Sequence, residues 1–342
     1  MKSVYTVNKK TFSDILSRKF EYLRISVTDR CNYRCSYCMP SEVFNNKYSY
    51  IAQNKILSYE EIIHLCSILK KIGLTKIRIT GGEPLLRKNI DKLVYKLKTE
   101  SGIHNVSMTT NGSLLTDSKL KQLKSSGLDS ITLSLDTLDP KKITKINGTK
   151  KHFDLDMVLT GIEKYFTTVK TNTVVIKDIN DNEVLDIVNK ISTLRSEIRF
   201  IEYMDVGESN NWNFSKIIPS QELYELINSK YELSIIKTDK SSTSKKWALK
   251  NTDSSVGFIS SITEPFCNDC NRARLSVDGK IYTCLFATEG HDIKKIIRAS
   301  RNDQDILDYF YNLWSKRSDR YSEVRFMQKK DSPKVEMSYI GG

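Results

Sequence analysis

The chain has 342 residues, of which 39% are hydrophobic and 28% are charged. This balance suits a folded globular protein and argues against intrinsic disorder, and the length allows one large domain with an appendage or two domains. No run approaches the roughly 18 apolar residues of a membrane span. Residues 1–20 also lack the apolar core of a signal peptide, so we expect a cytoplasmic protein without a membrane partner.

Positive charge is in excess, because 54 lysines and arginines against 41 acidic residues give a net charge of +13. Such an excess fits either nucleic acid or an anionic small molecule as a binding partner. The basic residues are spread along the chain rather than gathered in one block. The positions of individual arginines therefore say more about the partner than the net charge does.

Strand-like and helix-like segments alternate through the first 205 residues. We expect strands at Leu23–Thr28, Lys76–Gly81, Val106–Thr110, Ser130–Leu135, Val169–Ile176 and Glu197–Tyr203. Helices are predicted between them at Tyr59–Ile72, Ile90–Thr99, Lys119–Ser125, Leu155–Phe166 and Asn182–Leu194. Ser58 and Glu61 form a capping-box pair at the first helix, and Gly73 ends it. Six such units, rather than eight, predict an α/β fold with an incomplete (β/α)6 TIM-type barrel.

The predicted strands alternate polar and apolar residues, although parallel strands covered by helices usually read as continuous apolar runs. The polar faces carry Arg24, Ser26 and Thr28, then Lys76, Arg78 and Thr80, then Ser107, Thr109 and Asn111, then Thr132, Ser134 and Asp136, then Lys170 and Asn172. A closed eight-stranded barrel fills its interior with branched apolar side chains. A polar and cationic inner face therefore predicts an open lumen that holds a charged ligand, with a solvated sheet face as the alternative.

The pattern changes after about residue 205. A helix at Gln221–Ser229 precedes short β-like runs, and a last helix is expected at Ile306–Trp314. The β-like runs are Tyr231–Lys237, Val256–Ile262, Ala273–Val277 and Lys280–Cys284. We therefore expect a C-terminal β-rich appendage, with residues 1–205 as the barrel and residues 206–342 as the C-terminal region.

Three of the seven cysteines follow the first predicted strand in the spacing Cys-x3-Cys-x2-Cys, namely Cys31, Cys35 and Cys38. Clustered cysteines in a cytoplasmic chain indicate metal ligands rather than disulfides. A structural zinc site takes four closed ligands, whereas a [4Fe–4S] cluster held by three thiolates leaves one iron open for a ligand. The loop also follows a strand at the end where α/β barrels place their active sites.

A second group of three cysteines consists of Cys267, Cys270 and Cys284. The sequence around Asp278-Gly279 predicts a β-hairpin with a two-residue turn, which sets Cys284 opposite Ala273 and brings it back beside Cys270. From the spacing alone, zinc with a fourth ligand such as His291 is as well supported as an iron–sulfur cluster.

Two other features have simpler interpretations. Cys66 shares one helix face with Ile62, Leu65 and Leu69, so we expect it in the core. The run Asn147-Gly148-Thr149 is a glycosylation sequon, which has no meaning in a cytoplasmic protein.

With these motifs in place, the sequence resembles the radical S-adenosylmethionine enzymes, and within them the GTP 3′,8-cyclases that begin molybdopterin synthesis. The resemblance rests on residues 28–40, 79–84, 109–112, 134–136 and 199–205 and on the C-terminal cysteines, and it extends from about Leu23 to Gly342. It implies two [4Fe–4S] clusters, with S-adenosylmethionine at the first and the guanine of GTP at the open iron of the second. One departure is Ser17-Arg18, where the family usually has Gly-Arg.

The resemblance also implies roles for single residues. S-adenosylmethionine would be bound by Tyr37, Gly82, Ser134 and Met204. GTP would be contacted by Arg24, Arg78, Thr109, Lys170, Arg272 and Arg274, with Lys76 and Arg199 as further candidates. Arginine suits this role because its rigid fork of donors matches phosphate. The Gly341-Gly342 tail would reach into the active site.

The implied reaction is a radical cyclisation. A 5′-deoxyadenosyl radical takes hydrogen from C3′ of GTP, the resulting carbon radical attacks C8 of guanine, and an electron and a proton complete (8S)-3′,8-cyclo-7,8-dihydroguanosine 5′-triphosphate. The cofactors would carry this chemistry while the protein positions and protects them. The resemblance further implies a protein reductant and a downstream partner, cyclic pyranopterin monophosphate synthase, without nucleic acid. The oligomeric state, a homodimer included, stays open.

Two alternative functions remain open from the sequence. The first is another twin-cluster radical S-adenosylmethionine enzyme that modifies a peptide or RNA, against which Arg272, Arg274 and the Gly-Gly terminus argue. The second is a non-enzymatic, zinc-stabilised RNA-binding protein, which the net charge and the C-terminal cysteines suggest.

Overall fold

A single mixed sheet organises the computed structural model, which describes residues 12–150, 153–300, 302–325 and 334–341. Within these residues the sheet has twelve strands in the order β12-β11-β10-β1-β2-β3-β4-β5-β6-β9-β8-β7. Its central strands, all parallel, are β1 (Tyr22–Ser26), β2 (Lys76–Thr80), β3 (Asn105–Thr110), β4 (Ser130–Ser134), β5 (Val169–Val175) and β6 (Ser196–Glu202). Each lies within two residues of its predicted bounds, so the incomplete α/β barrel is confirmed.

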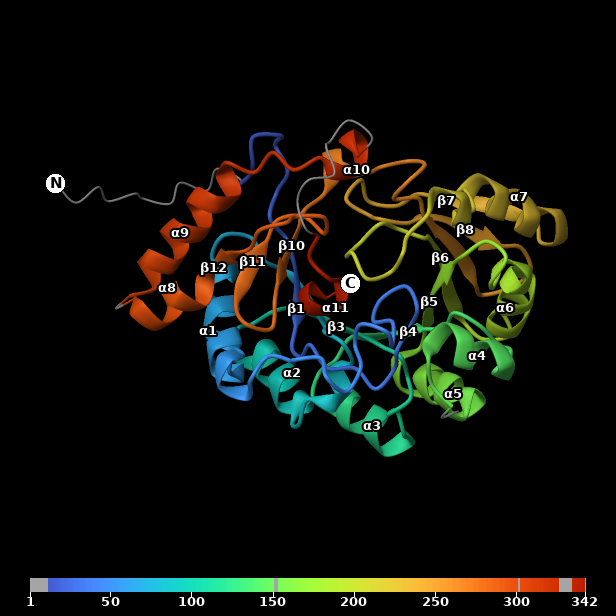
Figure 1. Cartoon of the computed structure of the whole chain (residues 1–342), viewed down its shortest axis with the longest axis horizontal. Helices are drawn as coiled ribbons and strands as arrows, with labels where there is room; N and C mark the ends of the chain where they lie inside the picture. The colour runs from blue at the N-terminus through green and yellow to red at the C-terminus, as the bar shows by residue number, and fades with distance from the viewer. Residues whose placement is uncertain (1–11, 151–152, 301, 326–333, 342) are drawn as a thin grey trace.

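Helices cover the outer face of these strands (Figure 1). They are α1 (Tyr59–Lys70), α2 (Ile90–Thr99), α3 (Asp117–Ser125), α4 (Pro140–Asn147), α5 (Leu155–Phe166) and α6 (Val184–Ile191). The capping box of Ser58 and Glu61 is present at α1. Helix α4 was not predicted, because Ile146 is its one buried residue among those described and its sequence shows no apolar periodicity. Its start was signalled only by Asp139 as N-cap and Pro140 at the first turn.

The C-terminal region continues the same sheet at both edges. Its strands are β7 (Leu233–Ile236), β8 (Lys245–Leu249), β9 (Ser255–Ile259), β10 (Arg272–Leu275), β11 (Lys280–Tyr282) and β12 (His291–Asp292). Strand β9 runs parallel to β6, and β10 runs parallel to β1. The chain therefore adds strands to one edge of the barrel sheet and then crosses to the other edge. This crossing brings the second cysteine group beside the first strand.

The remaining helices lie beside these edge strands and near the C-terminus (Figure 1). They are α7 (Ser220–Lys230), α8 (Ile293–Ala299), α9 (Asp303–Ser315), α10 (Tyr321–Val324) and α11 (Met337–Ile340). Short 3-10 turns occur at Gln53–Lys55, Pro84–Leu86, Asp181–Glu183, Phe214–Lys216 and Cys267–Asp269. None of the helices in the described ranges is both long and apolar enough to cross a lipid bilayer.

The main core lies between the sheet and the covering helices. Leu23, Ile25, Ile77 and Ile79 point to this side and are fully buried, while the alternating polar residues face the interior of the barrel. Cys66 is buried in the same core, as predicted. Burial of branched side chains stabilises a fold by about 1.5–3 kcal/mol each. This one-sided core leaves the inner face free for polar residues.

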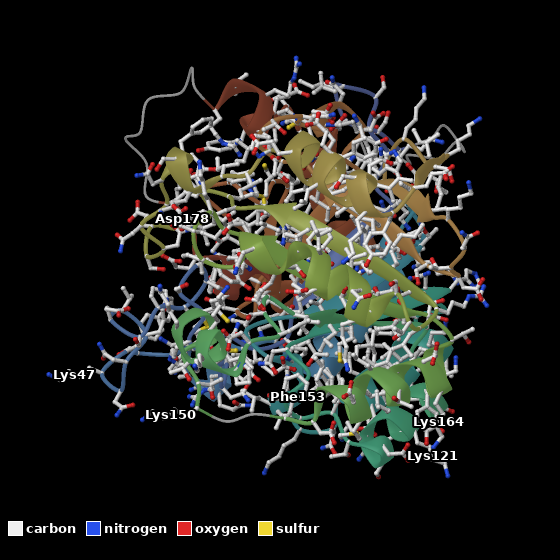
Figure 2. All side chains as sticks on the ribbon, turned by 90° about the vertical axis from the view of Figure 1, so that its right-hand side faces the viewer. Lys47, Lys121, Lys150, Phe153, Lys164 and Asp178 are labelled. Atoms are coloured by element: carbon white, nitrogen blue, oxygen red, sulfur yellow. The ribbon has the colours of Figure 1, made fainter. Side chains whose placement is uncertain are left out.

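Charged side chains populate the outer surface, where Lys47, Lys121 and Lys164 project away from the ribbon (Figure 2). Lys164 forms an ion pair with Asp117 at 3.0 Å, although both side chains are more than half exposed. Exposed pairs of this kind contribute little to stability. Much of the excess positive charge is therefore solvated, and the cations that line the interior are a separate set.

The hairpin between β10 and β11 differs from its prediction. Arg274 pairs with Tyr282, so residues 277–279 form a three-residue turn instead of a two-residue one. Gly279 has φ +85°, which is the left-handed position that closes such a turn. Continued along the strand, this register sets Cys284 opposite Arg272 and not opposite Ala273. The predicted return of Cys284 toward Cys270 survives this shift of one residue.

Candidate active site

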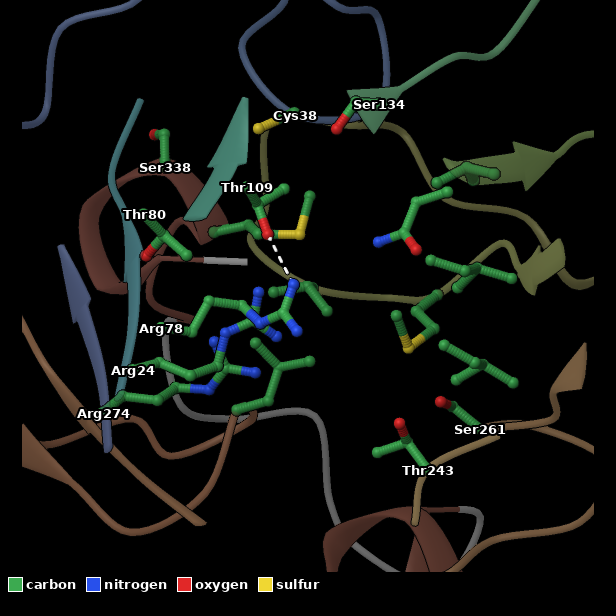
Figure 3. A pocket seen from close by; sticks show the side chains of 18 of the residues that line it. Arg24, Cys38, Arg78, Thr80, Thr109, Ser134, Thr243, Ser261, Arg274 and Ser338 are labelled. Carbon is green, nitrogen blue, oxygen red and sulfur yellow. Dashed lines mark hydrogen bonds between the residues drawn. The ribbon is translucent and has the colours of Figure 1, made fainter. Parts of the chain in front are cut away.

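A cavity of about 360 Å³ lies inside the partial barrel and extends to the carboxyl ends of its strands. Its lining contains most of the predicted site residues, namely Cys31, Cys35, Cys38, Cys267, Cys270, Cys284, Tyr37, Gly82, Ser134, Met204, Arg24, Arg78, Thr109, Arg199, Arg272 and Arg274. In Figure 3, Cys38 and Ser134 lie at one end of the view, and Arg24 and Arg274 lie toward the other. The two cysteine groups, more than 200 residues apart in sequence, thus face one space.

Two of the predicted GTP contacts do not line this cavity. Lys76 is exposed at the start of β2, and Lys170 is the second residue of β5 and half-buried. Burial, opposed by the nearby Glu197 carboxylate, lowers the pKa of Lys170. Both side chains sit toward the amino ends of their strands. Direct contact of Lys76 or Lys170 with GTP stays a prediction.

The first cysteine loop is held by the unpredicted helix α4. The backbone N–H of Arg34 donates to the carbonyl of Asn147 at 2.8 Å, and that of Ser36 donates to the carbonyl of Ile146 at 2.9 Å. The Asn147 side-chain amide donates to Cys35 Sγ at 3.3 Å. The last turn of α4 therefore accepts from the loop backbone and also donates to a cysteine sulfur.

Burial dominates the chemistry of these three thiols. It raises the pKa of Cys31 to about 11 and raises the pKa values of Cys35 and Cys38 further. A buried thiolate needs compensating positive charge, and a bound metal supplies it directly. Three sulfurs in one cavity wall, disfavoured as free thiolates, therefore fit a metal cluster as their partner.

Two buried carboxylates shape the surroundings of the first loop. Asp136 accepts from the Tyr37 hydroxyl at 2.7 Å, and burial raises the pKa of Asp136. Glu83 accepts from Thr110 Oγ1 at 2.8 Å and from the backbone N–H of Asn111 at 2.8 Å, and burial raises its pKa to about 7. These carboxylates fix Tyr37 and the turns after β2 and β3. Neither was given a role from the sequence.

Gly82 occupies a position that no other residue type can fill. A Cβ on Gly82 would lie 2.3 Å from the carbonyl oxygen of Arg30, far inside van der Waals contact. The Gly82 N–H donates to the Thr28 carbonyl at 2.7 Å. The backbone at residue 82 is thus locked against the cysteine loop, and this close packing is what requires glycine there.

The second cysteine group has a more positive environment than the first. Burial would raise the pKa of Cys270, but the guanidinium groups of Arg272 and Arg317 outweigh it and lower the value to about 6. Burial raises the pKa of Cys284 to about 12 and also raises that of Cys267. Arg317 was missed by the sequence reasoning, because it lies 47 residues from Cys270 and no local motif marks it.

The cysteine sulfurs do not form a site for a single ion. Among the described residues, no three His, Cys, Asp or Glu side chains are grouped closely enough to hold one metal ion. In an iron–sulfur cluster each thiolate binds a different iron atom, so the sulfur ligands surround a larger volume. His291, the predicted alternative fourth zinc ligand, is exposed on β12 and does not line the cavity.

Arginines form one wall of the cavity. Arg78 donates to Tyr22 Oη at 2.6 Å, to Thr109 Oγ1 at 3.1 Å and to Thr132 Oγ1 at 2.9 Å (Figure 3). Burial lowers the pKa values of Arg199 and Arg274 to about 10. For Tyr22, burial would raise the pKa, but the neighbouring Arg78 and Arg24 lower it to about 8.

This arrangement of cations favours a multiply charged anion. Burial, followed by repulsion from Arg274, lowers the pKa of Arg24 well below its ordinary value. An anion that accepts hydrogen bonds from several neighbouring guanidinium groups reduces the repulsion between them. Phosphate matches the fork geometry of these groups. The cationic inner face that the strand pattern predicted is therefore present, with Arg24, Arg78 and Arg199 in the cavity lining.

The C-terminal segment reaches the cavity. Helix α11 lies within the ring of strands (Figure 1), and Met337 and Ser338 contribute to the lining. Arg274 donates to the carbonyl of Gly341. Gly341 has φ +73°, and a Cβ there would meet Thr80 Oγ1. Gly342, the last residue of the predicted tail, lies outside the described residues.

Ser17, at the position where the family usually has glycine, has an unusual backbone conformation. Ser17 adopts φ +62°, a left-handed conformation that glycine takes without strain. Its neighbour Arg18 is buried, donates to Asp14 Oδ2 at 2.6 Å and donates to the carbonyl of Cys267 at 2.8 Å. The Ser-for-Gly difference therefore changes the strain of the turn and preserves the contact with the second cysteine loop.

Comparison with known proteins agrees with this geometry. The model of the Radical SAM superfamily matches residues 25–191, and the model described as Molybdenum Cofactor Synthesis C matches residues 196–323. The fold is shared with SuiB of Streptococcus suis bound to S-adenosylmethionine, with a TM-score of 0.58 at 18% identity over 92% of this chain and 69% of that one. At this level of identity the similarity concerns the fold alone.

Full-length relatives define the family more narrowly. A GTP 3′,8-cyclase of Staphylococcus epidermidis is 41% identical over 98% of this chain and 100% of that protein. The GTP 3′,8-cyclase of Staphylococcus haemolyticus is 40% identical, and that of Staphylococcus aureus is 39% identical, each over 96% of this chain and 98% of the relative. The chain therefore belongs to the GTP 3′,8-cyclase family of the radical S-adenosylmethionine superfamily.

Proposed function

We propose that this protein is a radical S-adenosylmethionine GTP 3′,8-cyclase. It converts GTP to (8S)-3′,8-cyclo-7,8-dihydroguanosine 5′-triphosphate in molybdenum-cofactor synthesis. The observation that carries the proposal is one cavity lined by two cysteine triads with arginines between them. Neither a zinc-stabilised RNA-binding protein nor a peptide modifier accounts for this combination together with family membership.

The first cysteine group is the site for the cluster that works with S-adenosylmethionine. Cys31, Cys35 and Cys38 would hold a [4Fe–4S] cluster, and their buried thiols fit a metal partner. When bound, this cluster and S-adenosylmethionine would supply a 5′-deoxyadenosyl radical to take hydrogen from C3′ of GTP, and one electron and one proton from a reductant and solvent would complete the bond between C3′ and C8. A second [4Fe–4S] cluster at Cys267, Cys270 and Cys284 is the finer part of the proposal.

The residues near the first loop orient S-adenosylmethionine. Gly82 lines the cavity with its backbone packed against the cysteine loop, and the hydrogen bond from Tyr37 to Asp136 fixes the tyrosine ring. Ser134 and Met204 line the same part of the cavity. Such fixed groups place reacting atoms in line before the reaction, which is where much of an enzyme's advantage arises.

The arginine wall binds and orients the nucleotide. Arg24, Arg78, Arg199, Arg272 and Arg274 present guanidinium groups to the cavity. The triphosphate carries several negative charges, so contacts to several arginines fix its position more tightly than one ion pair would. Met337 and Ser338 of the C-terminal segment line the cavity, and they would help to exclude water, which a radical reaction requires.

Several predictions from the sequence accompany this proposal. They are direct contact of Lys76 and Lys170 with GTP, a protein reductant, and cyclic pyranopterin monophosphate synthase as the next enzyme. A cytoplasmic location, a homodimer and a division of the chain at residue 205 are also predictions. Each needs its own measurement.

Anaerobic purification followed by metal analysis and turnover tests the proposal. We expect about eight irons per chain, from two four-iron clusters, and a cyclised nucleotide when GTP, S-adenosylmethionine and a reductant are supplied. Arg272→Ala should lower cyclisation at least a hundredfold, while reductive cleavage of S-adenosylmethionine continues. Arg195→Ala, at an exposed position between α6 and β6, is the matched control and should cyclise GTP normally. Zinc in both sites, or normal cyclisation by Arg272→Ala, would contradict the proposal.

A further inference from the structure

Arg317 lies directly against a predicted ligand of the second cluster. It follows helix α9, and its side chain is 1% exposed. Its Nη2 atom donates to Cys270 Sγ at 3.3 Å, and its Nη1 atom donates to the Cys270 carbonyl at 2.7 Å. One rigid guanidinium therefore holds both the backbone and the sulfur of the same cysteine.

A buried network fixes this guanidinium. Asp14 Oδ2 lies 3.5 Å from Arg317 Nη1, and Asp319 Oδ2 lies 3.2 Å from Arg317 Nε. The Arg317 guanidinium also lies over the Trp314 ring, 4.5 Å from its centroid. The carboxylates contact edges of the fork other than the Nη2 that reaches sulfur. The network thus orients the cation and leaves Nη2 to donate to Cys270 Sγ.

Arg18 provides a parallel support for the other end of the Cys-x2-Cys loop. It shares the Asp14 carboxylate at 2.6 Å and donates to the Cys267 carbonyl at 2.8 Å. It also donates to the carbonyl of Asp319 at 2.7 Å. Segments near residues 14, 267 and 317 are therefore joined at this loop. Arg317 is the member of this network that reaches a cysteine sulfur.

We propose that Arg317 is a positioning residue for the second cluster, which holds Cys270 in place and raises the reduction potential of that cluster through its N–H···S hydrogen bond. This inference rests on the proposed second [4Fe–4S] cluster. A reduced cluster carries more negative charge than an oxidised one, so donors and cations at its sulfurs favour the reduced state. Arginine is suited to this because it stays charged when buried.

A redox titration of the second cluster alone tests the inference. Replacing Cys31, Cys35 and Cys38 by Ala leaves one iron–sulfur signal, which is followed by electron paramagnetic resonance under anaerobic conditions. We compare the proteins at the midpoint potential of the triple-Ala protein that keeps Arg317. At this potential we expect Arg317→Gln to lower the ratio of reduced to oxidised cluster at least threefold. Arg317→Lys keeps the positive charge without the two hydrogen bonds to Cys270, so its ratio should lie between those of the Arg317 protein and Arg317→Gln. Arg298→Gln is the control, because Arg298 is half exposed and paired with Glu61.

The outcomes separate the inference from the proposed function. If the protein lacking Cys31, Cys35 and Cys38 but with Arg317 intact binds zinc or no iron, the proposed second cluster is wrong. Four irons per chain with the same midpoint in the parent and in both Arg317 variants overturn the role of Arg317. Loss of iron in both Arg317 variants, with an unchanged helical circular dichroism spectrum and full iron in Arg298→Gln, supports the holding of Cys270.

Discussion

At the scale of single residues, Tyr22 is an unexpected member of the arginine wall. Its hydroxyl accepts from Arg78 Nε at 2.6 Å and lines the cavity. Burial alone would raise the pKa of Tyr22, but the charges of Arg78 and Arg24 lower it to about 8. Above that pH the phenolate places a negative charge among the cations that would bind a triphosphate.

We therefore expect GTP affinity to fall as pH rises from 7 to 9. The lowered pKa means that Tyr22 is neutral below pH 8 and anionic above it, so the repulsion of GTP grows through this window. Since one nearby unit charge is worth on the order of 1 kcal/mol or more, the dissociation constant should rise roughly tenfold. Anaerobic equilibrium dialysis with GTP measures it.

Tyr22→Phe separates this effect from other titrations. The variant keeps the ring and removes the ionisable group, so its GTP affinity should change much less between pH 7 and 9. Tyr95→Phe, at an exposed position on α2, serves as the control and should behave like the parent. An identical pH profile for the parent and Tyr22→Phe would show that Tyr22 stays protonated.

At the scale of elements, the sequence predicted the parts whose residues alternate or repeat locally. Strands β1 to β6 and helices α2 and α5 have nearly their predicted bounds, because the apolar periodicity that marks each one lies within the segment itself. Helix α4 was not predicted, and the turn before Lys280 was predicted with two residues but has three. Helix α4 buries little, and the length of the turn depends on how β10 is held by β1.

The same distinction applies to the site. The cysteines, Gly82 and the strand arginines lie in local motifs, and they reach the cavity as expected. Asn147, Arg18 and Arg317 contact the cysteine loops from distant segments. In the sequence, Asn147 stands out only as part of a glycosylation sequon, which has no meaning in a cytoplasmic protein. Side chains that hold a ligand loop from elsewhere in the chain leave no pattern around themselves, so one sequence cannot reveal them.

Gly148 tests whether α4 supports the first cysteine loop. It has φ +60°, and a Cβ there would lie 2.5 Å from the carbonyl oxygen of Arg34. Gly148→Ala should push the loop away from the end of α4 and reduce iron from about eight to about four per chain, because only the second cluster stays bound. Anaerobic iron analysis with electron paramagnetic resonance measures the loss.

Gly102→Ala is a matched control for this change. Gly102 has φ +62°, but its added Cβ would meet only the flexible end of Lys70. Both substitutions carry the cost of a left-handed alanine, which is about 1 kcal/mol or more, and only Gly148→Ala disturbs the cysteine loop. Equal iron contents in the two variants would mean that α4 does not hold the cluster site.

At the scale of the whole molecule, the sheet builds a cavity with electrically different ends. Strand β10 returns to the edge of β1 and brings the second cysteines across the lumen from the first. Near the first group, carboxylates act on the thiols: Glu83 raises the pKa of Cys31, and Asp136 raises that of Cys35, each in addition to burial. Near the second group, Asp319 and Glu323 act in the same direction on Cys284 and Cys267, but Arg272 and Arg317 outweigh burial at Cys270 and lower its pKa to about 6.

This asymmetry sets the order of the two reduction potentials. Carboxylates near a cluster disfavour the added electron, whereas guanidinium groups favour it. We therefore expect the first cluster to have the lower midpoint potential. The order is measured by redox titration of two single-cluster proteins, one lacking Cys31, Cys35 and Cys38 and the other lacking Cys267, Cys270 and Cys284.

Replacing Arg272 by Gln should lower the midpoint potential of the second cluster, because it removes the largest attraction that acts on the Cys270 thiolate. The difference between the midpoint potentials of the two clusters should therefore become smaller. Equal potentials, or a lower potential at the second cluster, would contradict the electrostatic argument. A first cluster that is hard to reduce is also a strong electron donor once reduced. The carboxylate-rich end of the cavity therefore suits the end where S-adenosylmethionine is cleaved, and the arginine-rich end suits the nucleotide.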